Sequence, residues 1–345
     1  MKSLTFNDVK SLLQSPKNIV IVCHVNPDGD AIGSSLGLYH YLIQKGHVAD
    51  VIVPNDYPNF LKWIPGTSSV IQFEKNIKKA QKKLEVADLV FTLDFNALHR
   101  SGSMQKVLTE NTALKIMIDH HQQPDNYAAY TYSDVNMCST AEMVYNFIDQ
   151  LGDIALINKA IGSALYTGIM TDTASFRFPK TTSTTHRIVA HLIEIGVEHS
   201  EIHSKVYDAN RYERIKLLGT ALNNLTVIAP LHTAYITLSQ KELDKIGQQK
   251  GDTEGLVNYG LSVEGVKLAA IFIENKEEGI IKISLRSKGD LDVNLLAREH
   301  FSGGGHKNAA GGNMNKSLSE TLEMFEELLP KYLEELKKEN NLSNS

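Results

Sequence analysis

Short apolar runs alternate with segments of helical periodicity along the first half of the chain. Residues 19–23 form a continuous apolar run rich in β-branched side chains, which is typical of a buried parallel strand. The segment that follows has apolar residues at the spacing of one helix face and a stop signal at Gly46. Further strands are predicted at 48–53, 88–93 and 114–118, and a lysine-rich helix is predicted at 74–84. Strands that alternate with helices in this way predict an α/β fold with a doubly wound parallel sheet and helices on both faces.

The pattern changes twice in the second half of the chain. Between residues 139 and 195 it is helical, and Ser139 to Glu142 has the form of a capping box that opens one helix. From residue 225 onward strand patterns return, followed by a glycine-rich loop at 302–312 and a long amphipathic helix. The chain is therefore predicted to contain an N-terminal domain (1–195), a helical connector (196–222) and a smaller α+β C-terminal domain (223–345), with a cleft between the two domains.

Composition narrows the class of protein. The chain has 345 residues, a net charge of −5 and no extended block of Lys or Arg. Proteins that hold long nucleic acids usually carry a basic stripe, so a phosphorylated substrate is expected to be small. Two cysteines argue against a disulfide framework, and no apolar stretch reaches membrane-spanning length. We therefore expect a cytoplasmic protein with no membrane partner and no long duplex nucleic acid. Its oligomeric state stays open, with a homodimer as one alternative.

A cluster of polar residues directly follows the first predicted strand. His24, Asp28 and Asp30 lie there, at the carboxyl end of a strand, where ligands gather in doubly wound sheets. The carboxylates of Asp28 and Asp30 are close enough in sequence to repel each other unless a cation neutralises them. Taken alone, the segment equally suits a turn, because Asn, Pro, Asp and Gly are all turn residues.

Three further segments supply acidic or imidazole groups, two of them at the ends of predicted strands. They are Asp94, the triplet Asp119-His120-His121, and Asp172, which follows a predicted helix. The carboxyl ends of parallel strands meet at one edge of the sheet, so these groups are expected to converge with the first cluster. Carboxylates and imidazoles without thiolates favour manganese or a similar divalent ion, and the number of groups suits two ions.

The same residues form an ordered series of motifs. The series is His24…Asp28-Gly29-Asp30, then Asp94, then Asp119-His120-His121, then Thr171-Asp172. It resembles the four motifs of the DHH phosphoesterase superfamily, and Gly303-Gly304-Gly305-His306…Ala309-Ala310-Gly311 resembles the signature of the DHH-associated C-terminal domain. The match extends in order from residue 19 to residue 312. Size and motif order are similar to the oligoribonuclease and pAp phosphatase (NrnA) type within that superfamily.

The resemblance implies a role for each motif residue. It divides the metal ligands into two groups that share one residue: His24 and Asp28 for one ion, Asp30, His120 and Asp172 for the other, and Asp94 for both. It makes Asp119 a residue that orients its neighbours and His121 a phosphate contact. Asp94, Asp119, His120 and His121 together form the expected catalytic set. Residues 1–195 would then be the catalytic domain and 223–345 the substrate-binding domain.

The predicted substrate contacts lie in the C-terminal domain. The segment from Ser302 to Gly305 can present successive backbone N–H groups, and such a run can form an anion nest that needs glycine for close approach. His306 adds a side-chain donor, and Arg286 is a planar, bidentate phosphate partner by type. Taken alone, the glycine-rich segment has a flexible connection as its alternative, and Arg286 is more typical of an ordinary surface arginine.

The expected reaction is hydrolysis of short oligoribonucleotides or of 3′-phosphoadenosine 5′-phosphate (pAp) to mononucleotides, with two divalent ions, manganese by preference. A phosphodiesterase that acts on cyclic or linear dinucleotides is the alternative that the residues leave open. Exonucleases of the superfamily tend to be larger, and its pyrophosphatases lack the glycine–histidine segment. A non-catalytic nucleotide- or RNA-binding module is disfavoured, because such relatives usually lose metal ligands and every expected ligand is present.

Overall fold

The computed structural model describes residues 3–342, with side chains described for residues 3–332. The chain divides into two compact units, Met1–Ala209 and Asn210–Ser345. Their boundary lies inside the segment 196–222, which the sequence predicts to be a connector. Within the described range, none of the helices is both long enough and apolar enough to cross a membrane.

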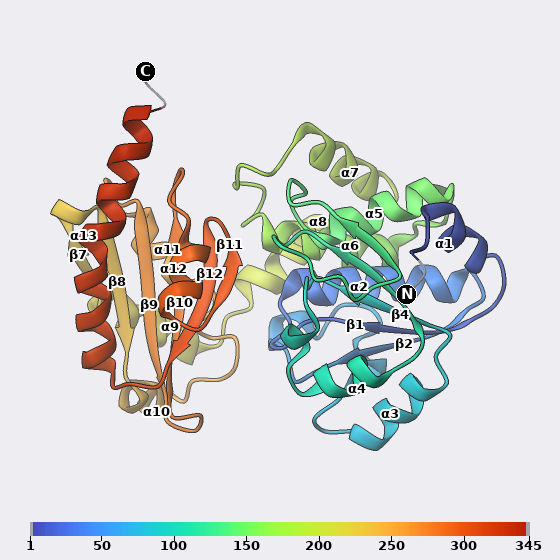
Figure 1. The fold of residues 1–345 in the computed structure, drawn as a ribbon, viewed down its shortest axis with the longest axis horizontal. Helices are drawn as coiled ribbons and strands as arrows, with labels where there is room; N and C mark the ends of the chain where they lie inside the picture. Colours follow the sequence, from blue (N-terminus) through green and yellow to red (C-terminus); the bar gives the residue numbers. More distant parts are fainter. Residues whose placement is uncertain (1–2, 343–345) are drawn as a thin grey trace. The chain divides into compact units, whose positions relative to one another are not determined.

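A six-stranded parallel sheet forms the centre of the first unit (Figure 1). Its strands are β1 (Asn18–Val22), β2 (Val48–Val53), β3 (Ile71–Gln72), β4 (Leu89–Leu93), β5 (Leu114–Asp119) and β6 (Tyr130–Ser133). Their order is β3-β2-β1-β4-β5-β6, and all neighbouring pairs are parallel. The order reverses between β1 and β4, and folds of this kind bind ligands at that point. The predicted doubly wound α/β fold is confirmed.

Two strands of this sheet have no clear sequence pattern. β3 spans two residues, and β6 is a polar and aromatic segment without fully buried residues. Both lie at an edge of the sheet, where a strand needs no continuous apolar run because it is not enclosed on every side. The four inner strands β2, β1, β4 and β5 match the predicted segments, with ends that differ by no more than one residue.

Helices cover both faces of this sheet. They are α1 (Phe6–Leu12), α2 (Gly29–Gln44), α3 (Ile77–Glu85), α4 (Gln105–Glu110), α5 (Thr140–Leu151), α6 (Lys159–Asp172), α7 (Ser183–Glu194) and α8 (His199–His203). Ile19 and Ile21 of β1 pack in the core with α2, α5 and α6. Val20 and Val22 point the other way, into the core with α3 and α4. Two buried faces explain the uninterrupted apolar run of β1.

A close helix contact brings two candidate ligands together. A Cβ on Gly33 of α2 would lie 2.6 Å from the carbonyl oxygen of Ala164 and 2.7 Å from the amide nitrogen of Gly168, both in α6. No side chain fits at such distances, so glycine is required there. Asp30 lies in the first turn of α2, and Asp172 is the last residue of α6 rather than a residue beyond it. The close approach of the two helices therefore helps to set the separation of these carboxylates.

The second unit contains a mixed six-stranded sheet flanked by helices. Its strands are β7 (Thr226–Ile228), β8 (Thr233–Leu238), β9 (Leu268–Asn275), β10 (Ile280–Ser287), β11 (Gly304–His306) and β12 (Ala309–Met314), in the order β11-β12-β10-β9-β8-β7. β8 pairs with β9 in parallel, and the other neighbouring pairs are antiparallel. Its helices are α9 (Tyr212–Asn223), α10 (Gln240–Ile246), α11 (Val257–Ser262), α12 (Val293–His300) and α13 (Leu318–Leu342).

Two separate cores hold this second sheet between its helices. On one face, α12 and α13 pack through a core that includes Phe272, Leu296 and Phe325. On the other face, α9, α10 and α11 pack through a core that includes Leu217 and Ile236. The predicted α+β character of this part of the chain is confirmed.

The glycine-rich segment is a β-hairpin, so the prediction of a loop at 302–312 is wrong. β11 and β12 pair at the edge of the second sheet, with Gly304 opposite Gly311. A Cβ on Gly303 would lie 1.9 Å from the carbonyl oxygen of Gly311. The small residues therefore allow close approach of two backbones, a common reason for glycine in strands, and composition alone does not distinguish this from a loop.

Candidate metal centre

The loop after β1 holds His24 through its own backbone. The Nδ1 atom of His24 lies 2.9 Å from the carbonyl oxygen of Val25. Because a carbonyl can only accept, Nδ1 carries the proton in this bond. The other ring nitrogen, Nε2, lies 3.3 Å from Oδ2 of Asp94 and 3.9 Å from Oδ1 of Asp28. Nε2 is therefore the position that a proton or a metal ion can occupy.

Asp28 combines the two roles that the sequence left open. Its Oδ1 atom accepts hydrogen bonds from the backbone N–H groups of Asp30 and Ala31, both at 3.0 Å, and so caps α2. The same carboxylate lies within 4.8 Å of ligand atoms of His24 and Asp94. Turn residue and ligand are compatible roles, because the cap orients the carboxylate without using all of its lone pairs.

Asp94 lies between two sets of partners. It follows β4 in a left-handed backbone conformation, with φ at 63°, which Asp tolerates better than most residues. Its Oδ2 atom faces His24, whereas Oδ1 lies 3.5 Å from Nε2 of His120 and 3.8 Å from Nδ1 of His121. Burial opposes ionisation, but hydrogen bonds from His120 and His24 outweigh it and hold the pKa of Asp94 well below its usual range. A carboxylate placed in this way can serve two cations at once.

His120 is at the centre of a second group. Its Nδ1 atom lies 3.2 Å from the carbonyl oxygen of Met137, so Nε2 is the nitrogen that faces the carboxylates. Nε2 lies 3.5 Å from Asp94, 3.5 Å from Asp172 and 3.8 Å from Asp30. His120 and Asp30 are buried, whereas the Asp172 side chain remains 26% exposed. The group therefore has one side open to solvent.

Crowded carboxylates dominate the electrostatics of this second group. Burial, followed by the charge of Asp94, raises the pKa of Asp30 well above its usual range, and burial raises the pKa of Asp172 to about 7. Burial also disfavours the imidazolium form of His120, but Asp94 and Asp172 outweigh it and raise its pKa to about 10. Divalent cations can replace the protons that such a group retains. The donor set of carboxylate oxygens and imidazole nitrogens fits manganese or a similar ion.

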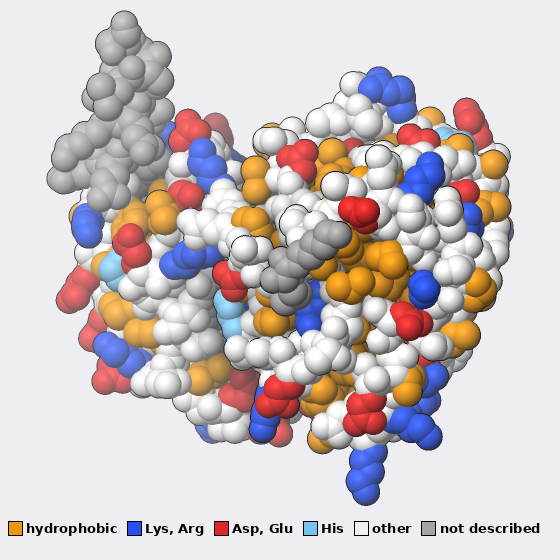
Figure 2. Space-filling model, turned by 45° about the vertical axis from the view of Figure 1, so that its right-hand side comes forward, with side chains coloured by type: hydrophobic (Ala, Val, Ile, Leu, Met, Phe, Trp, Pro, Cys, Tyr) orange, Lys and Arg blue, Asp and Glu red, His pale blue; other side chains and the backbone are white. Residues whose placement is uncertain are grey.

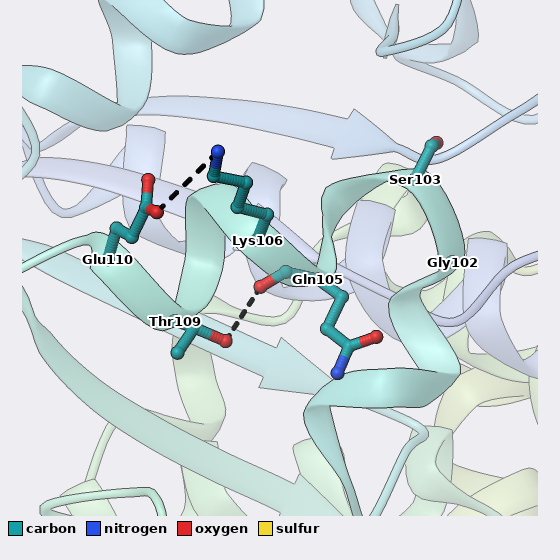
Figure 3. Close-up of a pocket in the computed structure, with 6 residues that line it drawn as sticks. All are labelled: Gly102, Ser103, Gln105, Lys106, Thr109 and Glu110. Carbon is teal, nitrogen blue, oxygen red and sulfur yellow. Dashed lines mark hydrogen bonds and ion pairs between the residues drawn. The ribbon is translucent and has the colours of Figure 1, made fainter.

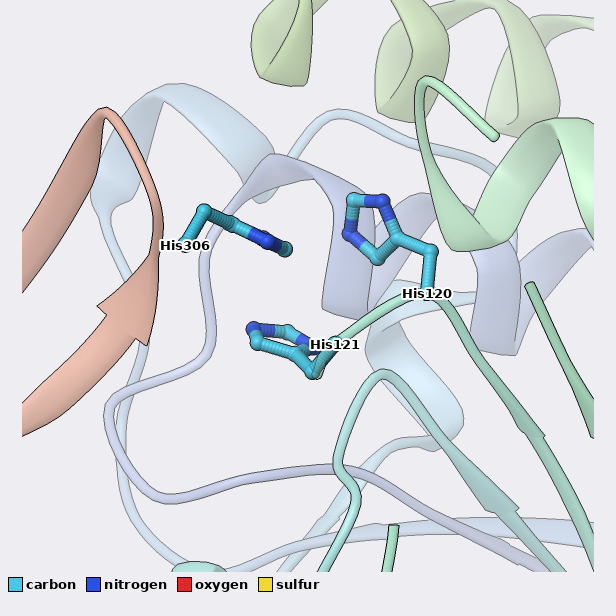
Figure 4. A group of neighbouring side chains, drawn as sticks. All are labelled: His120, His121 and His306. Carbon is cyan, nitrogen blue, oxygen red and sulfur yellow. The ribbon is translucent and has the colours of Figure 1, made fainter. Parts of the chain in front are cut away.

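Asp119 holds His121 with both of its oxygens. Oδ1 of Asp119 lies 2.7 Å from Nδ1 of His121, and Oδ2 accepts the backbone N–H of His121 at 3.1 Å. Burial, followed by the positive charge of Arg100, lowers the pKa of His121 well below its usual range, so its ring is neutral. Figure 4 shows the rings of His120 and His121 at the end of β5, with planes 77° apart. The third ring in that view, His306, belongs to the second unit.

The N-terminus of α5 contacts two candidate ligands, and no sequence pattern predicted these contacts. The backbone N–H groups of Thr140 and Ala141 donate to Oδ2 and Oδ1 of Asp30 at 2.6 and 2.8 Å. The hydroxyl of Thr140 donates to Oδ1 of Asp94 at 3.0 Å. A helix N-terminus favours negative charge, so α5 stabilises the ionised form of Asp30. The capping pattern indicated where this helix begins but not what it contacts.

The capping box predicted for α5 is half present. Ser139 is the N-cap, and its hydroxyl oxygen accepts the backbone N–H of Glu142 at 3.1 Å. The carboxylate of Glu142 is directed elsewhere: it accepts from the hydroxyl of Thr185 at 3.1 Å and from the thiol of Cys138 at 2.7 Å. Because Glu142 is buried, these two donors satisfy it within the core and tie the start of α5 to α7.

The residues predicted to bind substrate in the second unit form part of its sheet. Arg286 lies within β10, between Ala309 of β12 and Ala269 of β9, and is half-buried. Its Nη1 atom donates to the carbonyl oxygen of Leu285 at 2.9 Å. His306 is the last residue of β11 and is also half-buried.

Two of the four amides in the anion nest predicted at 302–305 bind groups of the protein itself. The N–H of Gly303 donates to the carbonyl oxygen of Ala297 at 3.1 Å, and the N–H of Gly305 donates to Oδ1 of Asn294 at 2.8 Å. The hairpin therefore does not present a run of successive open amides. A role of these glycines in substrate binding stays a prediction.

A surface hollow of about 350 Å³ lies beside α4, apart from the candidate ligands (Figure 3). It is lined by Gly102, Ser103, Gln105, Lys106, Thr109 and Glu110. The Lys106 and Glu110 side chains lie 3.9 Å apart within it. No candidate ligand contributes to its wall, so the hollow is not part of the metal centre.

Known families and proteins resemble this chain over most of its length. The profile of the DHH family, N-terminal domain, matches residues 18–169, and that of the DHHA1 domain matches residues 231–339. The chain is 33% identical over 298 residues to the bifunctional oligoribonuclease and PAP phosphatase NrnA of Thermus thermophilus, covering 86% of this chain and 84% of that protein. It is 30% identical over 323 residues to the probable bifunctional oligoribonuclease and PAP phosphatase NrnA of Streptococcus mutans, covering 94% and 97% of the two chains.

A solved structure gives the same result for the fold. The crystal structure of an exopolyphosphatase-related protein from Bacteroides fragilis superposes with a TM-score of 0.91 and 39% sequence identity. The superposition covers 96% of this chain and 97% of that protein. The resemblance that the motifs indicated is confirmed.

Proposed function

The chain belongs to the DHH family of phosphoesterases, and from this membership we propose that it hydrolyses short oligoribonucleotides and pAp to mononucleotides. The relatives from Thermus thermophilus and Streptococcus mutans are named for both activities and align with this chain over most of their length. The one observation that carries the proposal is the placement of Asp94, whose two carboxylate oxygens face His24 on one side and His120 on the other.

We propose that two divalent ions, manganese by preference, bind at this centre. His24 and Asp28 would hold one ion, Asp30, His120 and Asp172 would hold the other, and Asp94 would contact both. Ions bound there would stabilise negative charge on the phosphoryl oxygens of the substrate and would lower the pKa of a water molecule bound to them. The side chains contribute orientation: Nδ1 of each ligating histidine is held by a backbone carbonyl, so Nε2 points at the carboxylates.

His121 is proposed to hold the proton that a phosphoryl oxygen or leaving group needs. Its Nδ1 atom is held by Asp119, and Nε2 is the nitrogen that we propose contacts substrate. The ring is neutral in the protein alone, but an anionic phosphate at Nε2 would offset burial and Arg100. The carboxylate of Asp119 stabilises the resulting imidazolium, as a carboxylate does behind any histidine that exchanges protons.

Arg286 and His306 are proposed to bind a phosphate of the substrate, with Gly303, Gly304 and Gly305 shaping the hairpin that carries His306. A guanidinium forms paired hydrogen bonds to two phosphate oxygens, so it recognises a terminal phosphate better than a lysine does.

The distribution of surface charge suits a short substrate better than a long nucleic acid. Figure 2 shows lysine and arginine side chains dispersed among acidic ones on the visible face, not gathered in a stripe. The two reduced, buried cysteines favour the cytoplasm as the compartment.

The test is a substrate panel with manganese: pAp, a dinucleotide, a cyclic dinucleotide and pyrophosphate, ranked by kcat/KM. We expect pAp and the dinucleotide to rank first. Asp94→Ala should lower kcat/KM for both by about a thousandfold or more, because several kcal/mol of charge stabilisation depend on the ions. Wild-type turnover in this variant would refute the proposal. If the cyclic dinucleotide had the highest kcat/KM, the proposed substrate would be wrong and the enzyme would instead be a cyclic-dinucleotide phosphodiesterase.

A further inference from the structure

Thr140 contacts the shared carboxylate of the candidate centre, although it is not part of the ordered series of ligand motifs. Its hydroxyl lies 3.0 Å from Oδ1 of Asp94. The hydroxyl of Thr140 is the donor and the carboxylate oxygen of Asp94 is the acceptor. Thr140 is fully buried and Asp94 is almost fully buried, so no bulk water replaces this bond. A hydrogen bond to a buried charge is among the stronger ones in proteins.

The bond reaches one side of the carboxylate only. Oδ2 of Asp94 faces His24, at 3.3 Å. Oδ1 faces His120, at 3.5 Å, and is the atom that receives the hydroxyl of Thr140. The hydroxyl therefore acts on the oxygen that belongs to the group of His120, Asp30 and Asp172.

We propose that Thr140 is a positioning residue that orients Asp94 toward the His120 group and thereby sets the affinity of that group for its metal ion. The inference rests on the proposed function, because it takes from it the presence of two ions. The role proposed for the Thr140 side chain is exerted through Asp94. This side chain acts by restricting rotation of the Asp94 carboxylate about its own side-chain bonds, which the backbone of Asp94 does not fix.

Asp30 provides an internal contrast. Both of its oxygens are held by backbone N–H groups, those of Thr140 and Ala141. A substitution of the Thr140 side chain leaves those two donors in place. The substitution should therefore change the orientation of Asp94 but not that of Asp30. It should weaken binding of the ion held by the His120 group and leave the other ion unaffected.

The test measures manganese binding without turnover. Wild-type protein, Thr140→Val and Thr140→Ser are titrated with Mn²⁺, and free and exchange-coupled ions are counted by electron paramagnetic resonance. We expect wild-type protein to bind two ions. In Thr140→Val one ion should bind as in wild type and the other about 10–100-fold more weakly, the usual effect of losing a hydrogen bond to a ligand. Thr140→Ser should restore the second ion, because it keeps the donor.

Thr167→Val is the matched control. Thr167 is also fully buried, and its hydroxyl donates to the carbonyl oxygen of Ser163 in its own helix, at 2.7 Å. This variant removes a buried hydroxyl of the same size and should bind both ions as wild type does. Equal weakening in Thr167→Val and Thr140→Val would overturn the proposal, because it would show a general loss of stability. If Thr140→Val does not fold, Mn²⁺ binding is compared between Thr140→Ala, which lacks the hydroxyl donor, and Thr140→Ser, which keeps it.

The outcomes separate the inference from the function on which it rests. Two ions bound with unchanged affinity in Thr140→Val would overturn the role of Thr140 alone. Equal weakening of both ions would overturn the assignment to the His120 side. Failure of wild-type protein to bind a pair of ions would overturn the proposed function and this inference together. Loss of the same ion in Asp172→Asn and in Thr140→Val would support the assignment.

Discussion

In the first unit the candidate ligands lie at the ends of parallel strands and helices, are mostly buried, and most are held by hydrogen bonds with neighbouring groups. In the second unit Arg286 and His306 belong to antiparallel strands, are half-buried, and lie in or next to the hairpin at the sheet edge. Asp30 illustrates the first arrangement, with two backbone donors from α5. The contrast fits the roles proposed for the two units. Side chains held in place by their neighbours suit the proposed chemistry, and the edge hairpin is the proposed place of substrate recognition.

The largest expected effect tests the first-unit side of this contrast. Asp119→Asn keeps an acceptor opposite Nδ1 of His121 but removes the charge that stabilises its imidazolium form. We expect kcat to fall by about 10²–10⁴-fold, the range for losing a positioned proton donor, with Mn²⁺ affinity nearly unchanged. Steady-state kinetics and metal titration check this. A parallel loss of Mn²⁺ affinity would show that Asp119 acts as a ligand instead.

The next effect concerns the hairpin. In Gly303→Ala the new Cβ would lie 1.9 Å from the carbonyl oxygen of Gly311, so the two strands must separate. We expect the free energy of unfolding of the second unit to fall by about 1–3 kcal/mol, with the Mn²⁺ affinity of the first unit retained. Denaturant titration measures the change. Gly304→Ala is the control: its Cβ would meet Oδ1 of Asn294 at 3.5 Å, an ordinary contact, and should cost little.

A moderate dependence of Mn²⁺ affinity on pH is expected. The pKa of Asp172 is raised to about 7, so the metal-free protein carries a proton there at lower pH, and a metal ion must displace it. Mn²⁺ affinity should therefore rise with pH, by up to tenfold per unit below about pH 7 for this one proton. Asp94 adds nothing in this window, since its pKa lies well below its usual range, whereas His120, with its pKa raised to about 10, must release a further proton to bind the ion. Calorimetric titration at several pH values checks the slope.

The raised pKa of Asp172 also predicts how the stability of the metal-free protein depends on pH. A carboxyl whose pKa is raised by folding contributes stability below its unfolded pKa, and this contribution is lost as pH rises through about 7. Stability of metal-free protein should decline over that interval, and Mn²⁺ should reverse the decline. Asp172→Asn cannot titrate, so the part of each pH dependence that comes from this one proton should disappear, while the protons of His120 and Asp30 still contribute. An unchanged pH dependence in that variant would assign the effect to another group.

The smallest effect is expected at Arg286. Arg286→Lys keeps the charge but loses the planar pair of donors. We expect KM for a phosphorylated substrate to rise several-fold to about tenfold, while kcat changes little. Arg187→Lys serves as a control, because Arg187 is exposed on α7 and donates to Thr184. Equal changes in both variants would remove Arg286 from the proposed substrate contacts.

The inner strands and the convergence of ligands could be predicted because both follow from local rules. A short continuous apolar run, such as that of β1, predicts a parallel strand because both faces of such a strand are buried. Side chains that follow such strands must meet, since all their carboxyl ends lie on one edge. His24, Asp94 and His120 are therefore brought together by topology, although their sequence positions are far apart.

The parts that were missed depend on contacts that no local pattern encodes. β6 lacks an apolar run because it is an edge strand. The hairpin around Gly303 looks like a loop in composition, because glycine serves both close strand contact and turns. The bond from Thr140 to Asp94 joins residues 46 positions apart through one hydroxyl. Side-chain hydrogen bonds of that kind become visible only when the backbone is in place.

The reversal of strand order between β1 and β4 has a consequence for how the centre is assembled. Candidate ligands come from chain positions between His24 and Asp172, on both sides of that reversal. Contacts between such distant positions form late, because loop closure must come first. Ion uptake should therefore mark the last step in the maturation of the first unit, and a nascent chain released before Asp172 would lack one ligand of the centre.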